Sequence, residues 1–327
     1  MNIIYKILLK FRNYSERKFS LIKHIDCEKR PQVASDMIYD LLISEKPCMI
    51  SRLGGVELHC LTNYLGVKKG PFHLFRFITG KSDAWWWIPK RIFEMKNNAG
   101  FFSADDPKYI ERFCKLLLDD ISYIDILGSW QTRESYISDR LVGAKKVLLP
   151  FLEPYWGDQP WSRALQGKKV LVVHPFAQLI EKQYHNNRTK LFVNPDVLQP
   201  FQLKTLKSVQ SIGGISNGFS SWFDALDWMK NEIDKIDYDI CIIGCGAYGL
   251  HLAAHVKRQG KKAIHLGGAT QLMFGIKGKR WEDPMYGVNE WNIPTNFYVH
   301  LFNGFWVKPD ASFRPDKADS VEGACYW

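Results

Sequence analysis

The stretch of residues 238–278 constrains the fold of this chain more than any other part of the sequence. It opens with an apolar, β-branched run at 239–243, which predicts a buried strand. A glycine-rich turn follows, then a helix-forming stretch at 250–259 and a second short strand at 262–266. A strand, turn, helix and strand within about thirty residues make one βαβ unit, whose strands are parallel. We therefore expect an α/β fold with a mostly parallel, Rossmann-like sheet and helices on both faces.

Three glycines in the turn, Gly244, Gly246 and Gly249, have the G-x-G-x-x-G spacing. Glycine lets the backbone approach a ligand closely, and the free N–H groups and the dipole at the start of a helix attract phosphate. Between a strand and a helix, this pattern indicates a nucleotide-diphosphate site. The alternative is that the glycines serve only the tight packing of the strand against the helix.

The residues after the second strand argue against a dinucleotide cofactor. Dinucleotide-binding folds place Asp or Glu there to hold the ribose hydroxyls, whereas this chain has His265. The basic residues Lys277 and Arg280 follow and suit an anion without a nicotinamide, although a solvated basic loop has the same composition. The residues of this segment that we assign to the nucleotide are Gly244, Gly246, Tyr248, Gly249, His265, Gly267, Gly268, Gln271, Lys277 and Arg280.

The overall charge narrows the choice of partner. The 327 residues carry a formal net charge of +10, and 46% of them are hydrophobic, which is enough for a folded core. A strongly basic chain favours nucleic acid, an acidic membrane surface or a nucleotide as partner. Because the basic residues are dispersed and form no long run, we do not expect nucleic acid. We expect residues 25–327 to form a single α/β domain.

The seven cysteines are odd in number and include no CxxC pair, so the sequence indicates neither a disulfide framework nor a zinc site. Unpaired cysteines are typical of a reducing compartment, and we therefore expect a cytoplasmic protein. No apolar run reaches the roughly 18 residues that a transmembrane helix needs. The first residues also lack the pattern of a signal peptide.

Residues 1–24 are predicted to form a separate, basic amphipathic helix. Ile3, Ile4, Ile7, Leu8 and Phe11 fall on one helical face, and several lysines and arginines lie among them. Such a helix can lie on an anionic membrane surface, which for a cytoplasmic protein is the inner face of the cell membrane. The alternative is an ordinary helix that docks on the domain or on a second subunit of a homo-oligomer.

A second candidate site begins at a short strand, residues 48–51, which runs into the turn from Arg52 to Glu57. Arg52 then lies at the carboxyl end of the strand and Glu57 in the first turn of the next helix, at the edge where open α/β sheets bind ligands. Arg52 could hold a phosphate through two hydrogen bonds. Glu57 could bind a metal, hold a sugar hydroxyl or act as a base. The alternative role of Glu57 is to place favourable charge at a helix N-terminus.

A third group of polar residues surrounds the strand predicted at 169–174. His174 ends this strand, and the helix predicted at 176–185 presents Glu181 on its polar face, with Arg188 just beyond. A histidine, a glutamate and an arginine near a strand's carboxyl end can form an acid/base or phosphate-binding set. The alternative is a solvated helix face.

The aromatic residues are concentrated in two regions. The consecutive Trp85, Trp86 and Trp87 cannot all face one core, so contact of one with a sugar, a partner or a membrane is an alternative to simple packing of a loop. Beyond Trp281 the chain is irregular and rich in Trp, Pro and Asn, which predicts a tail that wraps the domain.

Two of these segments resemble the glycosyltransferases of the GT-D fold, a bacterial family once grouped as a domain of unknown function. The turn from Arg52 to Glu57 resembles the family's R-x-G-D-G-E-like turn. Residues 244–249, together with His265-Leu266-Gly267, resemble its late strand, small-residue turn, helix and strand. The stretch from His174 to Trp327 also resembles proteins of bacterial surface-polysaccharide gene clusters.

The resemblance implies transfer of a sugar from a nucleotide sugar, expected to be a UDP-sugar, to a lipid-linked acceptor in capsule or lipopolysaccharide O-antigen assembly. Arg52 and Gly54 would join the nucleotide site, and Glu57, or else His174 or Glu181, would be the base. In the family an Asp-x-Glu pair helps to hold a divalent metal, Mn²⁺ or Mg²⁺. Here Gly55 replaces the Asp, and one carboxylate is a poor metal site. Cationic side chains would then offset the charge of the diphosphate.

Two other functions are compatible with the same motifs. An NAD(P)-dependent oxidoreductase or a methyltransferase would use the same glycine turn, although the absence of an acidic residue at His265 argues against it. A non-catalytic component of polysaccharide assembly that binds sugar or membrane would account for the missing Asp at Gly55.

Overall fold

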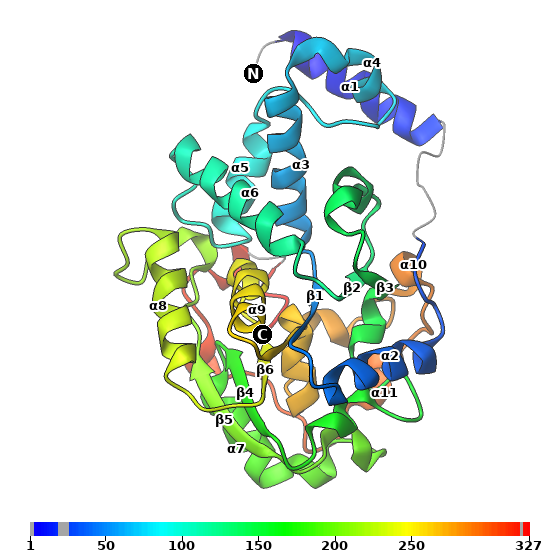
Figure 1. Cartoon of the computed structure of the whole chain (residues 1–327), viewed down its shortest axis with the longest axis vertical. Coiled ribbons are helices and arrows are strands. Elements are labelled where there is room, and N and C mark those ends of the chain that lie inside the picture. The colour runs from blue at the N-terminus through cyan, green and yellow to red at the C-terminus, as the bar shows by residue number, and fades with distance from the viewer. Residues whose placement is uncertain (1–2, 19–25, 321–322) are drawn as a thin grey trace.

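A computed structural model describes residues 3–18, 26–320 and 323–327. These residues form one seven-stranded sheet in which every pairing is parallel, in the order β3-β2-β1-β7-β6-β4-β5 (Figure 1). The predicted α/β fold with a parallel, Rossmann-like sheet is therefore confirmed. The strands are β1 (Cys48–Arg52), β2 (Ile126–Ser129), β3 (Lys145–Leu148), β4 (Lys169–His174), β5 (Gln202–Lys207), β6 (Ile240–Ile243) and β7 (Lys262–His265).

Helices cover both faces of the sheet, so the central strands are buried on both sides. In β4, Leu171 and Val173 belong to one apolar core, while Val170 and Val172 belong to the other. This is why the strand reads as a continuous apolar run without polar alternation. The longer helices are α1 (Ile3–Lys18), α2 (Pro31–Ile43), α3 (Gly55–Lys69), α5 (Pro89–Asn97), α6 (Pro107–Ile121), α7 (Ala177–Asn187), α8 (Trp222–Asp234) and α9 (Gly249–Arg258).

The two cores contain different helices. Helices α3, α6, α8 and α9 pack on one face around Phe113, Trp222 and Tyr248, whose rings lie in contact. Helices α2 and α7 cover the other face together with the residues that follow β7. The aromatic tail beyond Trp281 also lies on this second face, where Trp156 stacks on Phe297 at 3.4 Å between ring centroids. The tail contains the short helices α10 (Val288–Trp291) and α11 (Phe297–Leu301).

The sequence pattern also predicts a strand at 121–127, a helix at 133–141 and strands at 147–150 and 205–211, and the bounds of these elements differ in the structure. The strand predicted at 121–127 begins only at Ile126, because Ile121 still belongs to α6 and is buried in its core face. The segment at 133–141 is a 3₁₀ helix, Thr132–Arg140, whose start is fixed by a capping box between Gln131 and Glu134. The strands predicted at 147–150 and 205–211 are displaced from β3 and β5 by a few residues. Apolar runs shared by a helix end and a strand cannot be divided by periodicity alone.

The predicted N-terminal helix is present as α1, and residues 19–24 of that predicted segment lie outside the described residues. Helix α1 packs on the short helix α4 (Leu74–Ile78), away from the sheet (Figure 1). Tyr5 of α1 stacks on Trp86 with 4.2 Å between ring centroids, and Leu8 packs on the same cluster. The tryptophan run therefore supports α1. Among the described helices, none is long and apolar enough to cross a membrane.

A single buried carboxylate, Asp83, connects α1 to the body of the protein. Its oxygens lie 3.4 Å from Arg12 of α1, 2.7 Å from Arg91 of α5 and 2.6 Å from Arg133 of the 3₁₀ helix after β2. Thr62 of α3 donates a further hydrogen bond of 2.6 Å. Burial alone would raise the pKa of Asp83, but the three arginines outweigh it and hold that pKa well below its usual range.

Candidate functional site

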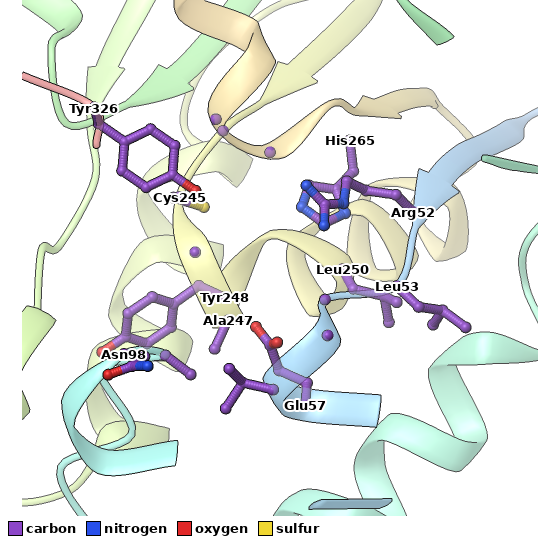
Figure 2. A pocket seen from close by; sticks show the side chains of 18 of the residues that line it. Arg52, Leu53, Glu57, Asn98, Cys245, Ala247, Tyr248, Leu250, His265 and Tyr326 are labelled. Atoms are coloured by element: carbon purple, nitrogen blue, oxygen red, sulfur yellow. The ribbon is translucent and has the colours of Figure 1, made fainter. Parts of the chain in front are cut away.

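A cavity of about 470 Å³ lies at the carboxyl ends of β1, β7, β6 and β4 (Figure 2). The chain leaves β1 into α3 on one face of the sheet, whereas it leaves β7 into a 3₁₀ helix, Gly267–Phe274, that packs on the other face. Neighbouring strands whose connections go to opposite faces leave a crevice between them. Ligands of open α/β sheets bind at such switch points, and this cavity is therefore the candidate functional site.

Most of the residues predicted from the sequence meet at this cavity. It is lined by Arg52, Gly54, Glu57, His174, Gly244, Gly246, Tyr248, His265, Gly267, Gly268, Gln271 and Arg280. Gly249, Glu181 and Lys277 do not line it. The two separate sequence segments, around Arg52 and around Gly244, are brought together because β1 and β6 both pair with β7.

Glu181 and Lys277 are the two predicted polar residues that the structure places elsewhere. Glu181 is exposed on the outer surface of α7, because the inner side of that helix is occupied by Ile180 and Tyr184. Lys277 follows the buried Ile276 and so points the other way, with its ammonium 5.6 Å from the ring centre of Phe302. Neither residue lines the cavity, so the structure gives neither of them a place in the candidate site.

Arg52 is the cationic group at the centre of the switch point. Its guanidinium lies 5.6 Å from the ring centre of Trp130, a distance typical of a cation–π contact. Within the described part of the chain it has no hydrogen-bond or ion-pair partner. Figure 2 shows Arg52 beside His265. A half-buried guanidinium with five unused donors is suited to an incoming phosphate or carboxylate.

Glu57 enters the cavity from the first turn of α3. Its carboxylate lies over Gly54, so closely that a Cβ at that glycine would be 2.0 Å from Oε2. Burial raises the pKa of Glu57, while a hydrogen bond from its own backbone N–H and the nearby charge of Arg52 partly offset that rise. Figure 2 shows its side chain extending toward the turn that carries Ala247. A carboxyl group with a raised pKa in a cavity is a candidate acid or base.

His174 is a hydrogen-bond donor to the cavity. Its Nδ1 accepts the backbone N–H of Phe176 at 3.0 Å. Burial lowers its pKa to about 3, so the ring is neutral near pH 7. In a neutral imidazole with Nδ1 as acceptor, the proton is on Nε2. His174 therefore has no free lone pair with which to act as a base, and that predicted role does not fit its tautomer.

His265 explains why no acidic residue follows β7. The ring is buried, with Nδ1 3.0 Å from the hydroxyl of Ser51. Burial, together with the charge of Arg52, lowers its pKa to about 3. A Cβ placed on Gly249 would lie 2.3 Å from its Nε2. The imidazole thus fills the space between β7 and α9 and leaves no group there to hold ribose hydroxyls.

The three glycines of the turn have different roles. A Cβ on Gly244 would meet the carbonyl oxygen of Gly267 at 2.6 Å and the ring of His174 at 2.7 Å. Gly246 has a φ of +56°, a left-handed conformation that favours glycine, and a Cβ there would make only an ordinary contact of 3.9 Å with the carbonyl oxygen of Ala99. Gly244 and Gly249 therefore serve the packing of strand against helix, which was the alternative interpretation, while Gly246 shapes the turn that faces the cavity.

We expect substitution of Gly249 by alanine to lower the free energy of unfolding by about 1–3 kcal/mol, since the added methyl would displace His265. Urea unfolding followed by circular dichroism measures this change. Gly143→Ala is the matched control, because nothing lies within 4 Å of its Cβ position, and it should change stability by less than about 0.5 kcal/mol. Equal stability of the two variants would contradict the packing role of Gly249.

Tyr248 and Gln271 line the cavity but are engaged with the protein. The Tyr248 ring is stacked on Trp222 at 4.6 Å, and its hydroxyl lies 2.9 Å from that of Ser211. The Gln271 amide donates to the carbonyl oxygens of Ile276 and Tyr326, both at 3.2 Å. These two residues hold the walls of the cavity in place.

Arg280 and the last residues of the chain form the wall on the other side. The Arg280 guanidinium lies 4.6 Å from the ring centre of Tyr326. The backbone N–H groups of Lys279 and Arg280 donate to the carbonyl oxygens of Trp327 and Cys325. The Tyr326 ring covers Gly268, where a Cβ would be 2.1 Å away. The tail thus builds part of the cavity itself.

Some lining residues were not predicted from the sequence. The aromatic ones are Phe113, Trp130, Phe176, Tyr286, Trp291, Tyr326 and Trp327. His251 of α9 also lines the cavity; its Nδ1 is 2.6 Å from the buried Asp120, and its Nε2 has no partner among the described residues. One feature of the sequence could have predicted that His251 lines the cavity. It lies two residues after the glycine turn, in the first turn of a helix, and helix N-termini at the carboxyl edge of a sheet face the ligand.

The cavity does not fit a divalent metal. The described residues contain no group of three or more His, Cys, Asp or Glu side chains that could converge on one ion. At Gly55, where the related motif has Asp, a Cβ would lie 3.4 Å from the ring of Trp130. Two carboxylates, Glu57 and Glu290, and two arginines, Arg52 and Arg280, line this cavity. The positive charge available to an anion therefore comes from Arg52 and Arg280.

Comparison of this chain with protein-family models, curated proteins and solved structures finds no match.

Proposed function

We propose that this protein is a glycosyltransferase that moves a sugar from a nucleotide-sugar donor to a saccharide acceptor. The observation that carries the proposal is the guanidinium of Arg52 at the switch point of a parallel sheet, where no described residue forms a hydrogen bond or ion pair with it, with the carboxyl group of Glu57 in the same cavity. An anion site next to a raised-pKa carboxyl group suits a reaction in which a diphosphate leaves and a hydroxyl loses a proton. The cavity of about 470 Å³ is within the usual range for small-molecule ligands.

Each residue then has a defined task. Arg52 and Arg280 bind the diphosphate and offset the negative charge that it gains as it leaves. The Nε2–H of His174 donates to an oxygen of the same group. The acceptor oxygen attacks the anomeric carbon, the bond from that carbon to the diphosphate oxygen breaks with its electron pair, and Glu57 takes the hydroxyl proton. This assignment needs no metal ion, in line with the donor set of the cavity.

The resemblance to GT-D enzymes supports the choice of substrates. It favours a UDP-sugar as donor and a lipid-linked saccharide of capsule or O-antigen assembly as acceptor, used at the inner face of the cell membrane by a cytoplasmic enzyme. The aromatic rings of Trp130, Trp291 and Tyr326 in the cavity wall are suited to stacking on sugar rings.

Isothermal titration calorimetry with UDP-, GDP- and dTDP-sugars, each with and without Mn²⁺, tests the proposal. We expect one nucleotide class to bind with a Kd that Mn²⁺ does not change. Binding of NAD(P) or S-adenosylmethionine in place of every nucleotide sugar would assign the cavity to an oxidoreductase or a methyltransferase. Binding of a free saccharide alone would indicate a non-catalytic component.

We expect Glu57→Gln to lower the rate of sugar transfer by about 10²- to 10⁴-fold while leaving the Kd of the donor unchanged. Because burial raises the pKa of Glu57, the rate of the wild-type enzyme should rise with pH through a midpoint above the usual carboxyl value of about 4.3. The residual rate of the variant should not show this rise. Glu181→Gln, on the exposed side of α7, is the control and should retain the wild-type rate and pH profile. A wild-type rate in Glu57→Gln would remove Glu57 from the mechanism.

A further inference from the structure

Helices α1 and α4 pack together at one end of the molecule, away from the sheet (Figure 1), and both helices have exposed apolar side chains. Ile3, Ile7 and Phe11 follow one another at four-residue spacing on α1, and 72%, 48% and 60% of their surface is exposed. Leu74 and Phe75 of α4 are exposed as well. We call these five residues the α1–α4 face. Large apolar side chains that are clustered and exposed mark an interaction surface.

The orientation of this face is held by contacts on the opposite side of α1. Tyr5 is stacked on Trp86 with an angle of 8° between the ring planes. The Arg12 guanidinium is buried and donates to the carbonyl oxygen of Ser82 and to the hydroxyl of Tyr136, each at 3.0 Å. Rotation of α1 to bury Ile7 would break these contacts. The apolar face is therefore presented outward by the fold.

The charges around the face are positive. Lys6 and Lys10 are exposed on α1 beside the apolar stripe. Exposed Lys69, Arg76 and Lys81 surround α4, and residues 66–82 contain no Asp or Glu. Apolar side chains flanked by basic ones are the pattern of a helix that lies in the interface of an anionic bilayer.

We propose that the α1–α4 face binds the surface of an anionic phospholipid bilayer. A second copy of the chain is a poorer occupant, because a self-complementary contact would bring the lysines of both copies together without acidic partners. This inference rests on α1 and α4 and does not depend on the proposed sugar transfer.

The length of α3 gives the distance between the cavity and the proposed membrane surface. This helix begins at the cavity with Gly55 and ends at Lys69, just before α4, and its 15 residues span about 22 Å. The cavity would then stand roughly 20 Å from the bilayer. A substrate that is tethered to lipid must reach over that distance, which suits a saccharide on an extended lipid carrier better than a lipid headgroup.

Flotation with vesicles of phosphatidylcholine and phosphatidylglycerol at a 3:1 ratio tests the proposal on the full chain. We expect the protein to float with these vesicles and to remain unbound with pure phosphatidylcholine or at high salt. Ile7→Glu with Phe11→Glu should abolish flotation. Lys6→Ala with Lys10→Ala should weaken it roughly 30-fold, since each basic residue near the surface contributes about fivefold. Lys145→Ala with Lys168→Ala, on exposed lysines elsewhere, should change nothing.

Three results would overturn the proposal. The first is failure of the wild-type protein to float, and the second is equal flotation of the wild type and the Ile7/Phe11 variant. The third is a dimer of the wild type in analytical ultracentrifugation where the variant is a monomer. That third result would assign the face to a second copy of the chain. Circular dichroism and nucleotide-sugar titration of each variant separate a loss of membrane binding from a loss of folding or of the cavity's function.

Discussion

Replacement of Asp83 by asparagine is expected to lower the free energy of unfolding by about 3–5 kcal/mol. The carboxylate is buried and pairs with Arg12, Arg91 and Arg133, and the change leaves these guanidinium groups without their counter-charge. Removal of one partner from a buried ion pair costs more than removal of the whole pair, because the remaining charge stays desolvated. Chemical unfolding at pH 7 measures the loss.

The pH dependence of stability provides a second test of the role of Asp83. Its folded-state pKa lies below the unfolded value of about 3.9, so its stabilising effect is present above that pH and is lost as the pH falls below it. The difference in stability between the wild type and Asp83→Asn should therefore shrink as the solution becomes more acidic. Asp105→Asn is the control: this exposed residue pairs with Lys96 on the surface, where a pair contributes less than about 1 kcal/mol. A loss at Asp83 no larger than that of the control would refute the anchoring role.

Replacement of Arg52 by alanine is expected to weaken the binding of a nucleotide sugar by about 2–5 kcal/mol, which corresponds to roughly 30-fold to several thousand-fold in Kd. Among the described residues the guanidinium has no hydrogen-bond or ion-pair partner, and a diphosphate bound there would lose its charge-assisted hydrogen bonds. Arg52→Lys should recover only part of the affinity, because an ammonium group cannot form the two parallel hydrogen bonds of a guanidinium. Titration calorimetry measures the Kd of the nucleotide sugar for the wild type and for both Arg52 variants.

Lys277→Ala is the matched control for Arg52. Both residues were candidates from the sequence, but Lys277 points toward Phe302 and does not line the cavity. Its removal should leave the Kd unchanged. If Lys277→Ala weakens binding as much as Arg52→Ala does, the affinity arises from the overall basic charge of the protein. The assignment of the phosphate to the cavity would then be wrong.

Much of the sheet was predictable, because strands and helix starts have local signals. Strand β4 has the bounds expected from its apolar run. The glycine turn ends β6, and Arg52 and His174 end β1 and β4. Carboxyl ends of parallel strands meet at one edge, so the parallel sheet alone brings these residues near each other. The order of the strands could not be predicted in this way, since it depends on pairings between distant segments.

The candidate site was predictable only in part. The period of α7 separates its apolar side from Glu181, but it does not say whether the polar side meets a cavity or solvent. From the sequence, the run of three tryptophans could contact a sugar, a membrane or a partner, or could simply pack in a loop. The structure shows that Trp86 packs on Tyr5 of α1. The walls built by Trp130 and Tyr326 arise from contacts across the whole chain, for which the sequence has no local pattern.

The sequence by itself determined the parallel α/β fold, the glycine turn and the identity of the strand-end residues, because periodicity and turn chemistry act over a few neighbouring residues. Only the tertiary structure decided what those residues do. It placed His265 against Gly249, so that two glycines serve packing. It also left Arg52 without a hydrogen-bond or ion-pair partner among the described residues, in a cavity that Tyr326 lines. These roles depend on which side chains fill the space around each group, and that space is formed by segments far apart in the chain.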